Sequence, residues 1–181
     1  MTRRLHVGGL VRREGWEVIS PMPGEHVDHV GNANNLSRFR DGTFAEIYAS
    51  HVVEHFDYRD ELQLALQEWF RVLQPGGRLL ISVPDLDVLA ALLLQKDALS
   101  LNERFEVMRM IFGGHIDAYD YHMVGLNEAF LDYFLVAAGF VNSRRVASFD
   151  LFEDTSSLLF RDVPISLNLI AEKPPRSEAL E

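Results

Sequence analysis

A helix, a Pro-Gly-Gly turn and an apolar strand follow one another between residues 60 and 84, and few folds accommodate this succession. From Asp60, which stands where a helix is capped, apolar residues recur at helical spacing as far as Leu73. The turn Pro75-Gly76-Gly77 ends the helix, and the run RLLISVP that follows is typical of a buried strand covered on both faces. Helix, turn and buried strand together predict an α/β fold.

Four short strand-like segments come before this block. They are rich in apolar and β-branched side chains and lie at residues 5–7, 16–19, 27–30 and 45–50. Only short stretches separate the first three segments, although a parallel crossover normally needs a dozen or more residues. Either the first crossovers are reduced to loops, or these strands are not all parallel.

Helices and two terminal strands are predicted in the rest of the chain. The helical patterns cover residues 86–95, 101–112 and 127–138, and the strands, paired antiparallel at the sheet edge, cover residues 140–148 and 165–173. A length of 181 residues suits one domain. We expect a single domain over residues 1–173 and a disordered tail over residues 174–181.

The composition excludes several classes of function. The formal net charge is -10 and the basic residues form no cluster, so we expect no nucleic-acid partner. The chain has no cysteine, which removes disulfides and thiolate chemistry. The longest apolar stretch, Val88–Leu94, is shorter than the roughly 20 residues that span a bilayer. Since no signal-peptide run is present either, we expect a soluble cytoplasmic protein without membrane contact.

A glycine pair, Gly8-Gly9, follows the first predicted strand. Ligands of α/β sheets bind beyond the carboxyl ends of the strands, where glycine lets the backbone approach them closely. The residues around the pair do not supply the G-x-G-x-x-G pattern of nicotinamide dinucleotide sites. The pair is therefore either a ligand contact of another kind or an ordinary tight turn.

Two histidines and a glutamate stand together after the fourth predicted strand. His51 and His55 would share one face of a helical turn, with Glu54 between them. A metal site is one interpretation, but zinc proteases carry such a motif inside a longer helix and add a further ligand. We favour local hydrogen bonds of Glu54 and His55 and predict no metal.

The segment 113–122, GGHIDAYDYH, is rich in polar and aromatic side chains. One interpretation is that it lines a substrate cleft, with His115 or His122 as the general base. The other is that it is a surface loop whose tyrosines have no special role.

Several segments together resemble the class I S-adenosylmethionine-dependent methyltransferases, in particular the small predicted methyltransferases. They are LHVGG (5–9), DGTFAEIYASHVVEH (41–55), RVLQPGGRLLISVP (71–84) and AGF (138–140). The resemblance extends from about residue 4 to about residue 173. It implies a Rossmann-like, mostly parallel sheet with an antiparallel C-terminal edge pair and helices on both faces, and the reduced N-terminal crossovers indicated by the short spacing depart from it.

The resemblance also implies that S-adenosylmethionine lies across the carboxyl ends of the first, second and fourth strands. Gly8 and Gly9 would then approach the methionine portion, and Asn32 and Ala33 would contact the adenine edge. Ser50 and His51 would form the near wall of the site. Such enzymes usually have an acidic residue at the end of the second strand, where this chain has Ser20, and a second one at the position of Asn32. Leu10 also stands where glycine is common. Serine and asparagine still form hydrogen bonds, but without the strength that a carboxylate adds.

By this resemblance the chain transfers a methyl group from S-adenosylmethionine to a small-molecule or saccharide acceptor. The departures at Leu10, Ser20 and Asn32 leave an alternative, which is a non-catalytic methyltransferase-like binding or scaffold protein. A third hypothesis is a metal-dependent hydrolase that uses the His51–His55 motif. Apolar helix faces in so short a chain also suggest a homodimer.

Overall fold

The computed structural model describes residues 2–176. Its helices and strands are, in chain order, β1 (Arg4–Val7), β2 (Trp16–Ser20), β3 (His29–Val30), β4 (Phe44–Ser50), the 3-10 helix η1 (Val53–His55), α1 (Glu61–Val72), β5 (Leu73–Pro84), α2 (Leu86–Leu93), α3 (Leu101–Phe112), α4 (Glu128–Ala137), β6 (Val141–Arg145), the 3-10 helix η2 (Thr155–Ser157), β7 (Leu159–Phe160), β8 (Val163–Pro164) and β9 (Ser166–Glu172). Residue 1 of the predicted domain and residues 177–181 of the predicted tail lie outside the described residues.

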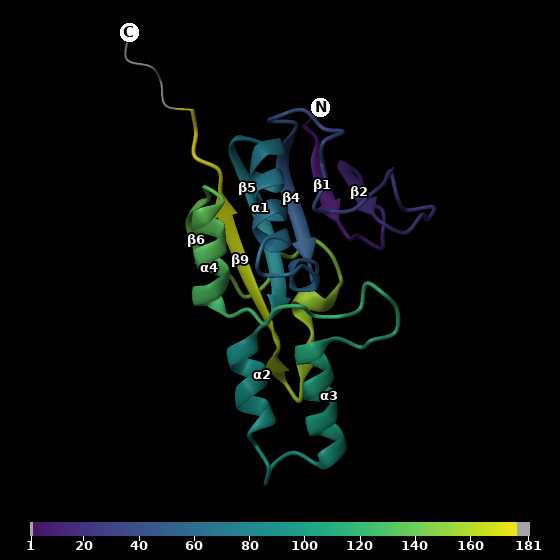
Figure 1. Ribbon diagram of the computed structural model, residues 1–181, viewed down its shortest axis with the longest axis vertical. Helices are drawn as coiled ribbons and strands as arrows, with labels where there is room; N and C mark the ends of the chain where they lie inside the picture. Colours follow the sequence, from purple (N-terminus) through teal and green to yellow (C-terminus); the bar gives the residue numbers. More distant parts are fainter. Residues whose placement is uncertain (1, 177–181) are drawn as a thin grey trace.

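Seven strands form one sheet in the order β3-β2-β1-β4-β5-β9-β6. The first five are parallel to one another, and β9 runs antiparallel between β5 and β6 (Figure 1). The sequence prediction of a mostly parallel sheet with an antiparallel C-terminal pair is thereby confirmed. Because β1 to β4 are parallel, their carboxyl ends all meet at one edge of the sheet.

The crossovers between β1, β2, β3 and β4 are loops without helices, as one of the two sequence interpretations held. The geometry allows this because the first strands are short. A four-residue strand such as β1 is about 13 Å long, and the loop 8–15 in extended form reaches roughly twice that distance. These loops put residues of the first three strand exits next to one another without an intervening helix.

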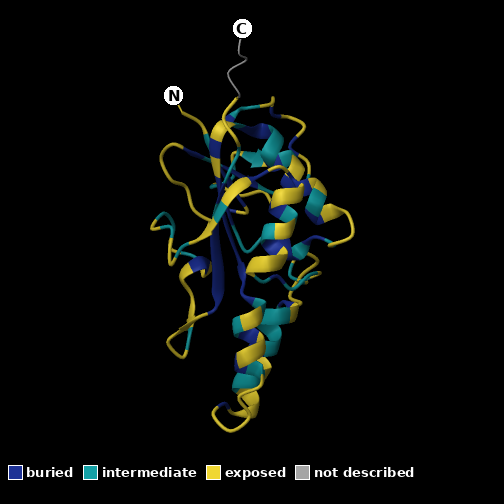
Figure 2. Cartoon of the chain, turned by 90° about the vertical axis from the view of Figure 1, so that its left-hand side faces the viewer, coloured by how far each residue is buried: buried dark blue, intermediate teal, exposed yellow. Residues whose placement is uncertain are grey.

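The two faces of the sheet are covered differently. On one face α1 and α4 pack on the strands, and α1 buries Leu62, Leu66 and Trp69 there (Figures 1 and 2). The other face was also expected to carry helices, but segment 146–158 covers it, with only η2 as helical structure. Phe149 and Phe152 of this segment pack on the strand residues of that face, so their rings provide the apolar cover that a helix would otherwise give.

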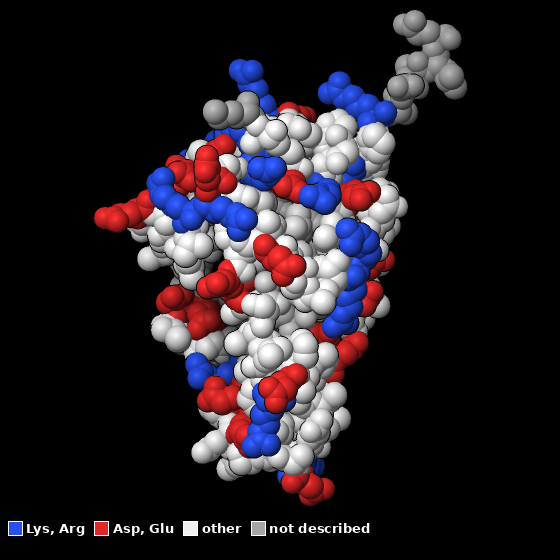
Figure 3. All heavy atoms as spheres, turned by 180° about the vertical axis from the view of Figure 1, so that it is seen from behind, with Lys and Arg blue, Asp and Glu red and all other residues white. Residues whose placement is uncertain are grey.

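Helices α2 and α3 form a hairpin that extends beyond the carboxyl edge of the sheet (Figure 1). The hairpin has a small core of its own, to which Leu89, Leu92 and Val107 contribute. Among residues 2–176, no helix is both long and apolar enough to cross a bilayer. The face seen in Figure 3 has Lys and Arg interspersed with Asp and Glu rather than gathered into one basic patch.

Candidate functional site

A pocket of about 230 Å³ opens at the edge where β1, β2 and β4 end. Five residues that the sequence proposed for cofactor contact line it, namely Gly8, Ser20, Asn32, Ala33 and His51. They come from four separate strand exits, which the parallel arrangement brings to the same place. This is where α/β folds bind their ligands.

Gly8 meets a conformational and a steric requirement at this pocket. Its φ of 72° lies in the left-handed region, and its N–H donates to the carbonyl of Ile19 at 2.9 Å. A Cβ at this position would lie 2.9 Å from Cγ2 of Val52, closer than real contacts of that kind. Both requirements favour glycine at the exit of β1.

Gly9 and Ser50, the other two proposed cofactor contacts, do not line the pocket. A Cβ at Gly9 would lie 2.5 Å from Nδ1 of His6, so this glycine leaves room for the imidazole. The His6 ring packs against Tyr48 and Phe152, and its burial lowers the pKa of His6 to about 4. The requirement for a second glycine is therefore explained by packing.

His51 is held on the pocket wall by a hydrogen-bond chain. The Ser166 hydroxyl donates to the carbonyl of Thr155 at 2.8 Å and lies 2.9 Å from Nε2 of His51, so it accepts the proton of that nitrogen. His51 has a φ of 54°, an uncommon value for a residue other than glycine. Burial lowers the pKa of His51 to about 4, which favours the neutral ring.

Glu54 lies behind this wall and is almost completely buried, with 1% of its surface exposed. Its Oε1 is 3.4 Å from Nδ1 of His51. Burial raises the pKa of the Glu54 carboxyl to about 8. The sequence expectation of a local hydrogen bond of the Glu54 side chain is wrong, because neither carboxylate oxygen has a hydrogen-bond partner among the described residues.

His115 and His122, proposed as general bases, both lie outside the pocket lining. His115 is exposed, stacks on Tyr121 with ring centroids 4.1 Å apart, and lies 2.9 Å through Nε2 from the carbonyl of Phe112. His122 is half-buried beside His55, with ring centroids 4.9 Å apart, and only His55 reaches the pocket.

Segment 113–122 does reach the pocket, through Asp117 and Tyr119. One of the two sequence interpretations placed this segment along a cleft, but it selected the histidines rather than these two residues. Val52, His55 and Phe56 complete the wall that begins at His51, as expected for residues that directly follow a strand exit.

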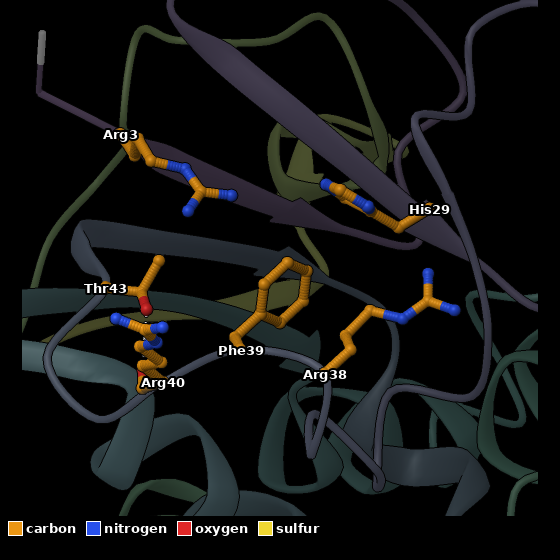
Figure 4. Close-up of a pocket in the computed structure, with 6 residues that line it drawn as sticks. All are labelled: Arg3, His29, Arg38, Phe39, Arg40 and Thr43. Atoms are coloured by element: carbon orange, nitrogen blue, oxygen red, sulfur yellow. Dashed lines mark hydrogen bonds between the residues drawn. The ribbon is translucent and has the colours of Figure 1, made fainter.

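A second cavity, of about 590 Å³, opens at the amino ends of β1 and β4. Figure 4 shows its lining residues, Arg3, His29, Arg38, Phe39, Arg40 and Thr43. Arg3 and His29 both contact the carboxylate of Glu17, at 2.6 Å and 2.7 Å. Cationic side chains dominate the lining, and no strand exit contributes to it.

Comparisons with known proteins agree with this arrangement. A family model described as "Methyltransferase domain" matches residues 19–81, about a third of the chain. No curated protein matches the sequence.

Solved structures share the fold at low sequence identity. A S-adenosylmethionine-dependent methyltransferase from Archaeoglobus fulgidus superposes with a TM-score of 0.61 at 17% identity, over 95% of this chain and 86% of that one. 1,6-Didemethyltoxoflavin-N1-methyltransferase from Burkholderia thailandensis, with S-adenosylhomocysteine bound, superposes with a TM-score of 0.57 at 17% identity, over 96% of this chain and 72% of that one. A possible exported protein of Bordetella parapertussis superposes with a TM-score of 0.59 at 13% identity, over 96% of this chain. The chain spans 63% of that protein, which is less than two thirds of its length. At these identities the structures show the fold.

Proposed function

Since the chain has the fold of the class I S-adenosylmethionine-dependent methyltransferases, we propose that it binds S-adenosylmethionine in the pocket at the ends of β1, β2 and β4 and transfers its methyl group. The family model and the shared fold confirm the resemblance seen in the sequence. The observation that carries the proposal is the convergence of Gly8, Ser20, Asn32, Ala33 and His51 on one pocket.

The types of side chain in the pocket lining suit this cofactor. Apolar walls with a few polar groups are typical of small-molecule sites, and here Ile19, Ala33 and Phe56 lie beside Ser20 and Asn32. The volume of about 230 Å³ is below the roughly 300 to 1,000 Å³ of most such sites. A cofactor fully enclosed by the pocket would therefore have to widen it.

Two exposed side chains in the lining make such widening easy. Met22 is 60% exposed and Tyr119 is 53% exposed. Neither has to leave a packed core to move, so displacing them costs little.

Each polar residue has a specific role in this proposal. The Ser20 hydroxyl accepts from the N–H of Met22 at 3.2 Å, so its own proton remains available for a ribose oxygen. Asn32 contacts the adenine edge, and Gly8 lets the backbone approach the methionine portion. The cofactor supplies a methyl group already activated on a sulfonium, so the protein contributes chiefly by aligning the acceptor with it.

The proposed acceptor is a small molecule or a saccharide. Such an acceptor would enter beside segment 113–122, whose Asp117 and Tyr119 line the pocket. A base is needed only for a hydroxyl or a protonated amine, and His115 and His122 stay the proposed bases for that case. The homodimer also stays a proposal, supported by the exposed aromatic side chains of Phe105 in α3 and Tyr133 in α4.

A non-catalytic binding or scaffold protein is the alternative. The observation that favours it is the lack of a carboxylate at Ser20 and Asn32, where the cofactor hydroxyls and the adenine amine would otherwise meet a charge. This alternative predicts no binding of S-adenosylhomocysteine.

Calorimetric titration with S-adenosylhomocysteine distinguishes the two. The blocking variant is Asn32→Trp, because Asn32 is exposed at the rim, whereas any side chain at Gly8 would strain the loop itself. The matched control is Thr43→Trp, which puts the same ring into the cavity at the amino ends. We expect saturable binding by the wild type and by Thr43→Trp, and none by Asn32→Trp. Wild-type protein that releases no heat would favour the scaffold alternative.

Methyl transfer is then measured directly. Wild-type protein is incubated with radiolabelled S-adenosylmethionine and a panel of small hydroxylated molecules and saccharides. Labelled product that is lost in Asn32→Trp would support the enzyme. Tight binding of S-adenosylhomocysteine without transfer to any member of the panel would contradict the proposed acceptor class.

A further inference from the structure

Glu54, His55 and His122 form a cluster of potential metal ligands directly behind the pocket. One donor atom from each side chain lies within 4.8 Å of the other two. Glu54 and His55 come from η1, whereas His122 comes from the loop before α4. His51, the third member of the sequence motif, is not part of this cluster, and His122 from a distant loop takes its place.

Backbone contacts hold the loop of His122 against η1. The N–H groups of Met123 and Val124 both donate to the carbonyl oxygen of Glu54, at 2.7 Å and 3.3 Å. Because Met123 directly follows His122, these bonds position the His122 imidazole beside the Glu54 side chain.

Both imidazoles are held by a backbone carbonyl through Nδ1. Nδ1 of His55 is 3.1 Å from the carbonyl of Tyr121, and Nδ1 of His122 is 3.3 Å from the carbonyl of Ile111. A carbonyl only accepts hydrogen bonds, so Nδ1 carries the proton in each neutral ring and Nε2 keeps its lone pair. Histidine ligands in metal sites are typically held through the second nitrogen in this way.

The surroundings of the Glu54 carboxylate are a second observation, independent of the clustering, that points to a bound cation. It is buried, and both of its oxygens lack a hydrogen-bond partner among the described residues. Nδ1 of His51 lies 3.4 Å from Oε1 of Glu54, but the proton of the neutral His51 ring is on Nε2, toward Ser166, so Nδ1 does not donate to Glu54. A buried carboxylate without a partner is unfavourable, and a bound cation would relieve this.

We propose that Glu54, His55 and His122 bind one divalent transition-metal ion, with zinc as the best match. Two imidazole nitrogens and one carboxylate are a ligand set of zinc sites that keep an open coordination position. Magnesium and calcium prefer oxygen ligands only. This proposal replaces the sequence expectation of no metal, and it does not depend on the proposed methyl transfer.

The proposal is tested by zinc titration of tag-free protein treated with chelator. We expect one ion per chain by calorimetry, and with cobalt in place of zinc the visible absorption of a protein-bound ion. His122→Ala should weaken zinc binding at least about tenfold. The matched control is His115→Ala, which removes an imidazole from the same loop but outside the cluster, and which should leave the affinity unchanged.

Two results would overturn the proposal. One is the absence of saturable zinc binding by the wild type, and the other is equal affinity in the wild type and in folded His122→Ala. If circular dichroism shows that His122→Ala does not fold, the same comparison is made with His55→Ala, which removes another imidazole of the cluster. Because the titrations contain no cofactor, their outcome is independent of S-adenosylhomocysteine binding.

Discussion

The cavities at the two ends of β1 and β4 differ in both size and chemistry. The one at the carboxyl ends measures about 230 Å³ and combines apolar walls with a few polar groups. The one at the amino ends measures about 590 Å³ and is lined mainly by arginine and histidine. Ligand sites in α/β sheets lie at the carboxyl ends and are mostly apolar. Position in the fold and lining chemistry therefore identify the candidate site, and volume alone would select the other cavity.

The titratable groups at the two ends of the strands also differ in what shifts their pKa values. Near the carboxyl ends, burial lowers the pKa of both His6 and His51 to about 4. Near the amino ends, a hydrogen bond from Arg3 is the main cause that lowers the pKa of Glu17 to about 2. One end excludes charge by burial, while the other pairs charges near solvent. The free energy of unfolding, measured as a function of pH, should therefore show a different pH range for the groups at each end.

The largest effect is expected at the carboxyl end, from His6. The pKa of His6 is about 4 in the folded state and about 6.5 when unfolded, so only the unfolded chain takes up the proton between these values. The free energy of unfolding should fall as the pH drops through this window, by up to roughly 3 kcal/mol. Urea unfolding at several pH values should show that His6→Phe removes this part of the pH dependence.

His115→Phe serves as the control for His6→Phe, because it replaces an exposed histidine that has no part in the core. His51 titrates in the same window, so the informative quantity is the difference between wild type and variant. If the curves of wild type and His6→Phe stay parallel across the window, burial of His6 does not distinguish this end of the strands.

A gain of affinity is expected from Ser20→Asp. Ser20 lines the pocket, and the methyltransferases that the sequence resembles usually have an acidic residue there for the ribose hydroxyls. Hydrogen bonds to a charged acceptor are stronger by about 1 kcal/mol or more, so S-adenosylhomocysteine should bind about tenfold more tightly. Calorimetric titration measures this. Ser37→Asp adds the same charge in an exposed loop and should leave the affinity unchanged.

An unchanged affinity in Ser20→Asp would argue that the ribose does not lie at the end of β2. Weaker binding would argue that the pocket suits an anionic ligand instead. Either result would remove the distinction in binding chemistry between the two cavities.

Local patterns in the sequence were enough to predict most of the fold. The segment Pro75-Gly76-Gly77 between an amphipathic pattern and an apolar run led to the observed α1 and β5, although β5 begins at Leu73 and includes the predicted turn. The strand exits were also visible, since Gly8, Ser20 and His51 follow apolar runs and meet at one pocket because parallel strands end together. What such patterns convey is the position and burial of each strand, whereas the parallel direction of the first strands comes from the structure.

Contacts between distant segments could not be predicted in this way. The position of His122 depends on the hydrogen bonds of Met123 and Val124 to the backbone of Glu54, and no spacing in the sequence signals them. Likewise, Phe149 and Phe152 cover the second face of the sheet from a segment without helical periodicity. Both features arise from packing between segments that are far apart in the sequence. Helical and strand periodicities describe only neighbouring residues, so they do not predict either feature.

The smallest effect is expected at the amino end, from Glu17. Its carboxylate accepts hydrogen bonds from Arg3 at 2.6 Å and 2.8 Å and lies 2.7 Å from Nε2 of His29. The pKa is lowered from 4.5 to about 2, so the stabilisation is complete above about pH 4.5 and is lost as the pH falls toward 2. Because the side chain is 27% exposed, solvent screening limits the contribution to about 1 kcal/mol or less.

Glu17→Gln should therefore lower the free energy of unfolding slightly at neutral pH and flatten its dependence below about pH 4.5. Glu14→Gln, at an exposed position, is the control. Between about pH 4.5 and 6.5, where His6 reduces stability, the Glu17 variant and the wild type should give parallel curves. Curves that diverge there would mean that Glu17 is coupled to another group that titrates in this window, and its contribution could not be treated as independent.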